Sequence, residues 1–281
     1  MLGSTIALSL MHASVRYLSV DLHPFVIAFF RNFLAVLLLF PIIARNNFAI
    51  MHSIHMKWHV LRASLNIIAM LMFFYALSIT ELAVVQALGF TAPLFATILA
   101  MVLLREKVRL RRWMALIIGF TGVLIVLRPG AVAIELGPLL VLGSAAVWAL
   151  TMIIIKRLSN TDSPLTITAW VAIFLTVLSL PTALLVWQWP QGWQWGILLF
   201  TAITGTVGQL LLTKAFAYTE ASIVMPFDFA KILWSASLGY WVFGEFVSLN
   251  TWIGALVIFS GACYVAIREH QLEKQNKRNI Q

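Results

Sequence analysis

Residues 225–245 read MPFDFAKILWSASLGYWVFGE, and most of them belong to an apolar run, residues 221–243, that is long enough to cross a bilayer as one helix. At ~1.5 Å per residue, Asp228 lies ~10 Å and Lys231 ~15 Å from the start of that run, near the middle of a ~30 Å hydrocarbon core. Ionisable side chains at that depth are costly and are kept mainly where they face a cavity or each other. The stretch therefore predicts a membrane helix with a polar function.

The composition of the whole chain indicates a polytopic membrane protein. Of 281 residues, 62% are hydrophobic and 10% are charged, and no hydrophilic stretch is long enough for a separate soluble domain. A net charge of +9 would favour nucleic-acid binding in a soluble protein, but here it is interpreted as a topology signal. The single cysteine, Cys263, excludes an internal disulfide. Residues 1–18 lack a basic leading region and a small-residue cleavage site, so we expect an uncleaved first span.

Polar, proline and glycine breaks divide the chain into ten hydrophobic runs. We therefore predict an all-α integral membrane fold of ten transmembrane helices, followed by a polar cytoplasmic tail over residues 269–281. The predicted spans are residues 1–18, 25–44, 58–79, 82–104, 113–127, 136–155, 165–187, 195–218, 221–243 and 252–267.

The two halves of the chain repeat. A shift of 139 residues places Thr80-Glu81 on Thr219-Glu220, Phe90 on Phe229 and Glu106 on Glu245, and about a quarter of the positions in this window are identical. A shift of 140 places Pro24 on Pro164. We therefore predict one five-helix repeat in residues 1–130 and a second in residues 131–268. Because five is odd, the two copies would cross the membrane in opposite directions.

The loop charges agree with inverted copies. The connector at residues 105–112 holds five basic residues, whereas its copy at residues 244–251 holds none. If both termini are cytoplasmic, only Arg16 and Arg128 among the basic loop residues fall on the outer side, which is the bias expected of the positive-inside rule. The uncharged loop at residues 187–195, with tryptophans at 187, 189, 193 and 195, would then lie at the outer interface.

Several motifs in the repeat resemble those of the EamA-type drug/metabolite transporters. The second half carries Thr219-Glu220-Ala221, Pro226, Gly244-Glu245, Trp252-Ile253-Gly254 and Gly261. The first half repeats this pattern as Thr80-Glu81, Pro93, Arg105-Glu106, Trp113 and Gly122, with Arg105 where the family usually has glycine. Within the family, residues 225–245 resemble the branch that contains S-adenosylmethionine and riboflavin carriers.

The resemblance implies a secondary transporter, not an enzyme, in a bacterial inner membrane. Two inverted halves would move a small polar or amphiphilic metabolite, S-adenosylmethionine-like or amino-acid-like, by alternating access. Export of amino acids, flavins or drugs on the same fold is an alternative, and so is a membrane channel or a membrane-embedded enzyme. The expected partners are the bilayer and a small-molecule substrate, without nucleic acid. Proton or counter-substrate coupling and a homodimer are left open.

Five polar residues within the predicted spans are candidates for substrate binding. Asp228, Lys231 and Ser235 share one face of the ninth span at three- and four-residue spacing, and Gln86 lies on the corresponding face of the fourth span. Arg31 lies ~9 Å inside the second span, where it could either reach the outer interface or line a cavity. Together Arg31, Lys231 and Asp228 leave a surplus positive charge, which would suit a substrate with a carboxylate.

Aromatic residues add candidates for stacking on a planar substrate group. Tyr75, Trp148 and Trp234 fall in spans that we expect to border the cavity. Trp170 could contribute in the same way or could face lipid.

Other polar residues have simpler interpretations. No phosphate-binding motif, metalloprotease helix or nucleophile triad is present, so no cofactor and no catalytic residue is expected. His52, His55 and His59 lack an acidic or thiol partner, which favours a solvated cytoplasmic loop over a metal site. His12 could titrate in a proton-coupled cycle or form a hydrogen bond in the core. Glu106 and Glu245 would lie at the N-termini of the helices that follow them, where the helix dipole favours a carboxylate.

Overall fold

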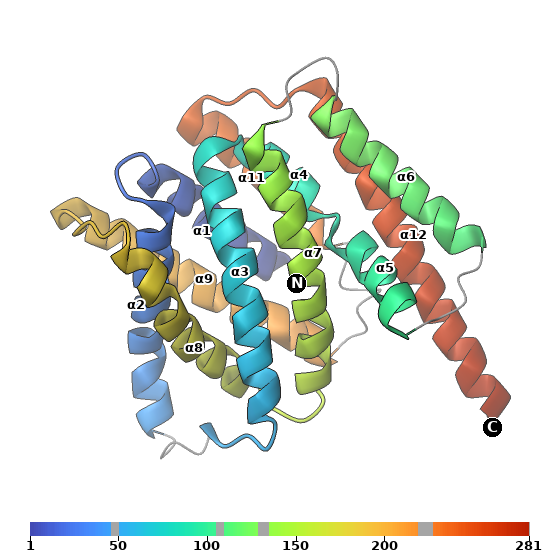
Figure 1. The fold of residues 1–281 in the computed structure, drawn as a ribbon, viewed down its shortest axis with the longest axis horizontal. Helices are drawn as coiled ribbons and strands as arrows, with labels where there is room; N and C mark the ends of the chain where they lie inside the picture. The colour runs from blue at the N-terminus through green and yellow to red at the C-terminus, as the bar shows by residue number, and fades with distance from the viewer. Residues whose placement is uncertain (46–50, 105–109, 129–134, 219–226, 281) are drawn as a thin grey trace.

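A computed structural model describes residues 1–45, 51–104, 110–128, 135–218 and 227–280. Every regular element in these ranges is helical, as the sequence predicts (Figure 1). The helices are α1 (Leu2–Leu18), α2 (Pro24–Arg45), α3 (Met56–Ile79), α4 (Leu82–Gly89), α5 (Ala92–Leu104), α6 (Leu110–Leu127), α7 (Leu136–Leu158), α8 (Pro164–Leu184), α9 (Gly192–Tyr218), α11 (Ala230–Phe243) and α12 (Leu249–Ile280).

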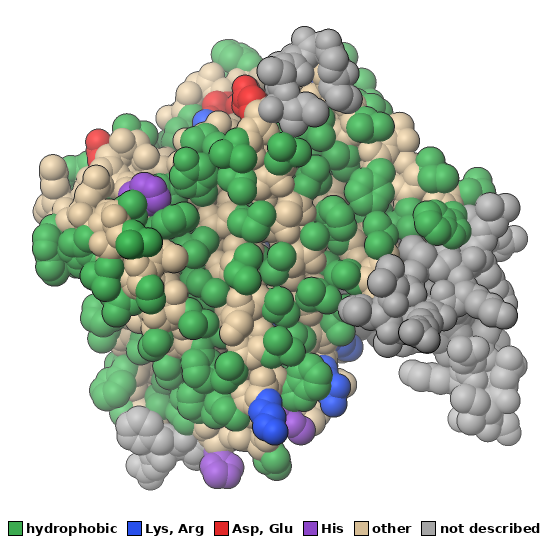
Figure 2. All heavy atoms as spheres, viewed as in Figure 1, with side chains coloured by type: hydrophobic (Ala, Val, Ile, Leu, Met, Phe, Trp, Pro, Cys, Tyr) green, Lys and Arg blue, Asp and Glu red, His purple; other side chains and the backbone are tan. Residues whose placement is uncertain are grey.

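Length and composition make this a bundle of membrane-spanning helices. Within the described chain, six stretches are long and apolar enough to cross a bilayer: Pro24–Arg45, Met56–Ile79, Leu82–Leu99, Leu136–Leu158, Pro164–Leu184 and Gly192–Tyr218. Shorter apolar helices cover Leu116–Leu127 and Leu249–Tyr264. With α1 and α11, this arrangement fits the ten predicted spans. Hydrophobic side chains cover most of the face seen in Figure 2, as expected of a surface that meets lipid.

The fourth predicted span is broken in the structure, whereas the sequence indicated one continuous helix. It consists of α4 and α5, separated by a turn at Phe90 and Thr91 in which the backbone N–H groups of both residues bond three residues back. Pro93 explains the break. Proline has no N–H to donate to the carbonyl of Gly89 four residues earlier, and it disfavours helical geometry in the residue before it.

A similar interruption lies in the ninth predicted span. Residues 219–226, including Pro226, lie outside the described residues, but Phe227 and Asp228 are helical, Phe229 is in a turn, and α11 begins at Ala230. The rings of Phe90 and Phe229 pack against each other with 5.4 Å between centroids. The two interruptions therefore meet inside the bundle.

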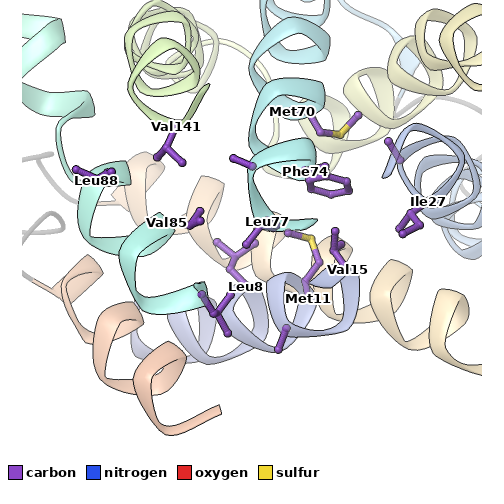
Figure 3. Close-up of a cluster of buried hydrophobic side chains, with 14 of the residues drawn as sticks. Leu8, Met11, Val15, Ile27, Met70, Phe74, Leu77, Val85, Leu88 and Val141 are labelled. Atoms are coloured by element: carbon purple, nitrogen blue, oxygen red, sulfur yellow. The ribbon is translucent and has the colours of Figure 1, made fainter. Parts of the chain in front are cut away.

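Four helix pairs form the frame of the molecule. The helix α3 packs along α7, α1 along α9, α2 along α8, and α6 along α12 (Figure 1). Small residues bring some of these pairs close: a Cβ on Gly122 of α6 would lie 2.7 Å from the carbonyl oxygen of Gly254 on α12. A buried cluster from many helices, part of which is drawn in Figure 3, fills the space between the pairs.

Charged side chains gather at the two ends of the bundle. In the view of Figure 2, acidic side chains lie near the upper end and most of the visible lysine and arginine side chains lie near the lower end, while histidines appear toward both. The helix α3 runs between these ends, since residues 51–55 lead into it at the bottom and α4 follows it at the top (Figure 1).

Candidate functional site

An internal cavity of about 200 Å³ lies between the helices. Its wall includes residues from every helix of the described chain except α6. Much of the wall is apolar, and several members of the buried cluster also line it: Leu8, Met11, Met70, Phe74 and Val141 (Figure 3). The interrupted segments reach the cavity as well, through Gly89, Phe90, Ala92 and Pro93. Backbone that leaves the helical pattern at this depth is tolerated where it lines a cavity.

The cavity wall contains an ion pair from the second interruption. Lys231 Nζ donates to Asp228 Oδ2 at 2.7 Å, three residues apart along the chain. Both side chains are partly exposed to the cavity, and Asp228 Oδ1 has no hydrogen-bond partner. Asp228 also lies just before the N-terminus of α11, where the helix dipole favours negative charge. The pair therefore has spare hydrogen-bonding capacity for another group.

Arg31 supplies a second positive charge to the cavity wall. Its Nη1 donates to Asn32 Oδ1 at 2.8 Å and contacts the sulfur of Met70, while its buried Nε has no partner. None of the described carboxylates forms an ion pair with it. Gly205 on α9 makes room for the guanidinium group, since a Cβ there would lie 2.7 Å from Arg31 Nη2. The structure therefore places Arg31 on the cavity wall and not at the membrane interface.

A polar and aromatic wall faces these charges. Gln86 Nε2 and His12 Nδ1 lie 2.6 Å apart, and the His12 ring packs on Phe73 with 4.9 Å between centroids. Both residues line the cavity, and so does Trp148. Flat rings beside amide groups can bind a planar group that carries hydrogen-bonding edges.

Three of the predicted site residues lie outside the cavity wall. Tyr75 packs near Phe25, with 6.2 Å between ring centroids. Trp234 donates its indole N–H to Thr5 Oγ1 at 3.2 Å, and the buried Ser235 lies 3.5 Å from Ser9 at the contact between α11 and α1. Trp170 also has a packing role, because its indole N–H donates to the Met51 carbonyl oxygen at 3.1 Å. The predicted residues that the structure brings together are Arg31, Gln86, Trp148, Asp228 and Lys231.

The cavity also contains polar residues that the sequence reasoning did not select. Asn66 on α3 and Gln209 on α9 both line it, beside the aromatic Phe73. The signal was present, because each amide interrupts an otherwise apolar run. A polar side chain deep within an apolar span needs a polar surrounding, and this holds for both amides as it does for the charged residues.

Comparison with known proteins identifies the family. The EamA-like transporter family matches residues 1–128 and again residues 135–267. The chain belongs to this family. It is a membrane transporter by that membership, which agrees with the apolar helices and the internal cavity.

Named relatives agree with the family assignment, and a solved structure shares the fold. This EamA-family chain is 32% identical to a riboflavin transporter of Vibrio cholerae, an alignment that covers 100% of the chain and 95% of the relative. It is 30% identical to an S-adenosylmethionine uptake transporter of Rickettsia bellii over 90% of the chain and 87% of the relative. A crystal structure with 15% identity matches the fold over 97% of both chains at a TM-score of 0.66.

At one end of α3, a polar cluster joins the loops that precede α3 and α8. His59 Nε2 lies 2.7 Å from Asp162 Oδ2, and Ser53 Oγ donates to the same oxygen at 2.6 Å. Burial raises the pKa of Asp162, but hydrogen bonds from Ser53 and His59 outweigh that effect and lower the pKa below its usual value. His59 is thus buried within α3 and not in a solvated loop, and the described residues contain no cluster of metal-binding side chains.

At the other end of α3, Arg16 and Glu245 form an ion pair. Arg16 also donates to the carbonyl oxygens of Leu77, at 2.9 Å, and Thr80, while Glu245 Oε2 accepts from the Leu82 backbone N–H at 3.0 Å. Glu245 therefore caps α4 and not the helix that follows it, contrary to the expectation from sequence. Gly244 makes this approach feasible through its left-handed backbone, with φ of 67°.

Proposed function

We propose that this chain is a secondary transporter that moves a small polar or amphiphilic metabolite across the bacterial inner membrane by alternating access. The observation that carries the proposal is the pair Asp228–Lys231, which faces an internal cavity at an interruption of a membrane helix. Charges are kept at such a depth mainly where a substrate or coupling ion uses them. In transporters built from repeats, the substrate site is typically formed by interrupted helices that face a cavity.

An inverted repeat would give the cavity its two alternating openings, and matched contacts support that repeat. Ser4 Oγ on α1 donates to the Gly208 carbonyl oxygen on α9, and Ser144 Oγ on α7 donates to the Ala69 carbonyl oxygen on α3, both at 2.8 Å. A shift of 140 residues takes Ser4 to Ser144, and one of 139 takes Ala69 to Gly208. The same shifts relate the packing of α1 on α9 to the packing of α7 on α3. They also relate the interruption at Phe90 to the interruption at Phe229.

We place the end with His59 and Asp162 in the cytoplasm, together with both termini. Lysine and arginine side chains gather at that end in Figure 2, in agreement with the positive-inside rule. The Arg16–Glu245 pair then lies on the outer side.

The substrate that fits best combines charged groups with a planar group. Asp228 would meet an ammonium or sulfonium group when Lys231 releases it, and the walls near Phe73 and Trp148 would hold a ring. S-adenosylmethionine has all of these features and an amino acid has the charges, which agrees with the names of the S-adenosylmethionine relatives. A flavin is the second candidate, since one relative is named a riboflavin transporter and the wall is aromatic.

Transport in proteoliposomes tests this proposal. The full chain is reconstituted and the uptake of labelled S-adenosylmethionine, methionine and riboflavin is measured with and without unlabelled substrate inside. We expect uptake of one of these compounds to be stimulated by internal substrate, as in a carrier. Steady flux without such stimulation would instead indicate a channel.

Variants of the ion pair give the matched comparison. Asp228→Asn and Lys231→Met should each reduce uptake to the level of empty liposomes while the protein still folds, because each leaves a buried charge without its partner and removes a substrate contact. Asp21→Asn, at an exposed loop carboxylate, is the control and should transport normally. Recovered transport in the double variant Asp228→Asn/Lys231→Met would show that the pair is structural.

A further inference from the structure

Each charged side chain that lines the cavity lacks a charged counterpart at the corresponding position of the other half. With the same shifts, Arg31 corresponds to Val171, Asp228 to Gly89 and Lys231 to Ala92. Both halves form the same helix order, so the fold does not require a charge at any of these three positions. In contrast, Arg16 corresponds to Lys156, and both donate to equivalent backbone carbonyl oxygens, those of Leu77 and Phe216. The repeated pair Arg16 and Lys156 therefore belongs to the frame, whereas the three unrepeated charges lie on the cavity wall.

Among the cavity charges, Arg31 is the unpaired one. The ammonium of Lys231 is held by a carboxylate at 2.7 Å, whereas the polar partners of the Arg31 guanidinium among the described residues are the neutral Asn32 amide oxygen and a sulfur atom. A buried cation without a counter-charge is costly, and a guanidinium group has five N–H donors to satisfy. The charge is thus available to a group that enters the cavity.

Two neutral amides flank Arg31 on neighbouring helices. Asn66 lies one turn before Met70, whose sulfur contacts Arg31, and Gln209 lies one turn after Gly205, against which the guanidinium packs. Both amides line the cavity; within the described structure the NH₂ group of Asn66 has no hydrogen-bond partner, and that of Gln209 has a long contact of 3.5 Å to Thr213 Oγ1. One unpaired cation between two amides can donate several hydrogen bonds to a single oxyanion, and the carboxylate that shares the cavity, Asp228, is already paired with Lys231.

We propose that Arg31, Asn66 and Gln209 form a subsite for one carboxylate or phosphate group of the transported molecule. The subsite rests on the proposed transport function and deepens it, because it assigns the anionic end of the substrate to Arg31 and leaves Asp228–Lys231 for the cationic end. The planar fork of the guanidinium matches both kinds of oxyanion.

Simple anions test the subsite without knowledge of the substrate. The full chain in lipid nanodiscs is heated in acetate, phosphate or chloride at equal ionic strength. We expect acetate or phosphate to raise the Tm by roughly 2–4 °C relative to chloride. Stabilisation by acetate alone would assign a carboxylate, and stabilisation by phosphate alone would assign a phosphate. No stabilisation by either anion would overturn the proposal.

Variants connect the effect to Arg31. Arg31→Gln should abolish the shift, whereas Arg157→Gln, at an arginine that lies over the Trp58 ring outside the cavity, should keep it. Gly205→Ala gives a second measurement, in which the positive charge is kept but moved. The added Cβ would lie 2.7 Å from Arg31 Nη2 and displace the guanidinium. This variant too should abolish the shift. A normal anion response in Arg31→Gln, or in a folded Gly205→Ala, would contradict the assignment.

Transport measurements separate this inference from the function on which it rests. If the chain transports a metabolite and Arg31→Gln leaves its preference for the anionic form unchanged, the subsite is wrong and the carrier stands. If anions stabilise the protein through Arg31 but none of the metabolites is transported, the subsite stands and the proposed substrates are wrong.

Discussion

At the scale of single residues, the polar cluster of Ser53, His59 and Asp162 ties the two halves together at one end of the bundle. The carboxylate of Asp162 accepts two short hydrogen bonds, and these stabilise its charged form. A carboxyl group whose pKa is lowered on folding stabilises the native state above its ordinary pKa of ~3.9, and this stabilisation is lost as the pH falls through the folded value.

The corresponding prediction concerns Asp162→Asn. At pH 7 the variant should lose ~1–3 kcal/mol of stability, because Ser53 and His59 lose a charged acceptor. The Tm difference between wild type and variant, measured in detergent, should shrink as the pH is lowered below ~4, where the wild-type carboxyl group also becomes protonated. A difference that stays constant across this range would show that the charge of Asp162 contributes nothing.

Sequence reasoning selected some residues of the cavity wall and failed on others for a physical reason. Burial depth alone indicates that Arg31, Asp228 and Lys231 need a polar environment, and the structure places all three on the cavity. Burial depth does not locate Tyr75 and Trp234 in the same way, because an aromatic side chain is equally stable against a cavity, a neighbouring helix or lipid. Helical periodicity gives the spacing of residues on a face but not the neighbour that the face meets.

At the scale of elements, the interruption between α4 and α5 is what brings backbone into the cavity. The sequence shows the cause, Pro93, but a continuous apolar run conceals whether proline only bends the helix or breaks it. Tertiary contacts decide this, since the rings of Phe90 and Phe229 pack where the two interruptions meet. The number of spans could therefore be predicted from the sequence, whereas the division of the fourth span could not.

Pro93→Ala tests whether the interruption is functional. The substitution supplies an N–H that can bond to the Gly89 carbonyl oxygen and allows α4 and α5 to join. We expect an unchanged or higher Tm, together with roughly tenfold slower uptake in proteoliposomes, a change that corresponds to about 1.4 kcal/mol in the barrier. Thr97→Ala, at a nearby hydroxyl that bonds within α5, is the control and should transport normally. Normal uptake by Pro93→Ala would make the break a packing feature only.

At the scale of the whole molecule, the cavity ends before it reaches the Arg16–Glu245 pair. The described lining residues on α1 stop at His12 and those on α4 begin at Gln86. The pair lies beyond both, since it is formed by Arg16 and by Glu245, which bonds the backbone of Leu82. One carboxylate there connects α1, the start of α4 and the connector between α11 and α12. Under the proposed alternating access, we expect this contact to close the outer side and to break in an outward-open state.

The native cysteine can report that opening. Cys263 lines the cavity and is the single cysteine of the chain, so its reaction with an impermeant thiol reagent added outside intact cells measures access from the outer side. In Glu245→Gln the closed state loses an ion pair, and a loss of ~1.4 kcal/mol would enlarge the open population about tenfold. We expect the labelling rate to rise by roughly that factor. Lys156→Gln removes the corresponding charge at the opposite end and should not accelerate labelling from outside. Equal rates in wild type and Glu245→Gln would show that another contact closes this side of the cavity.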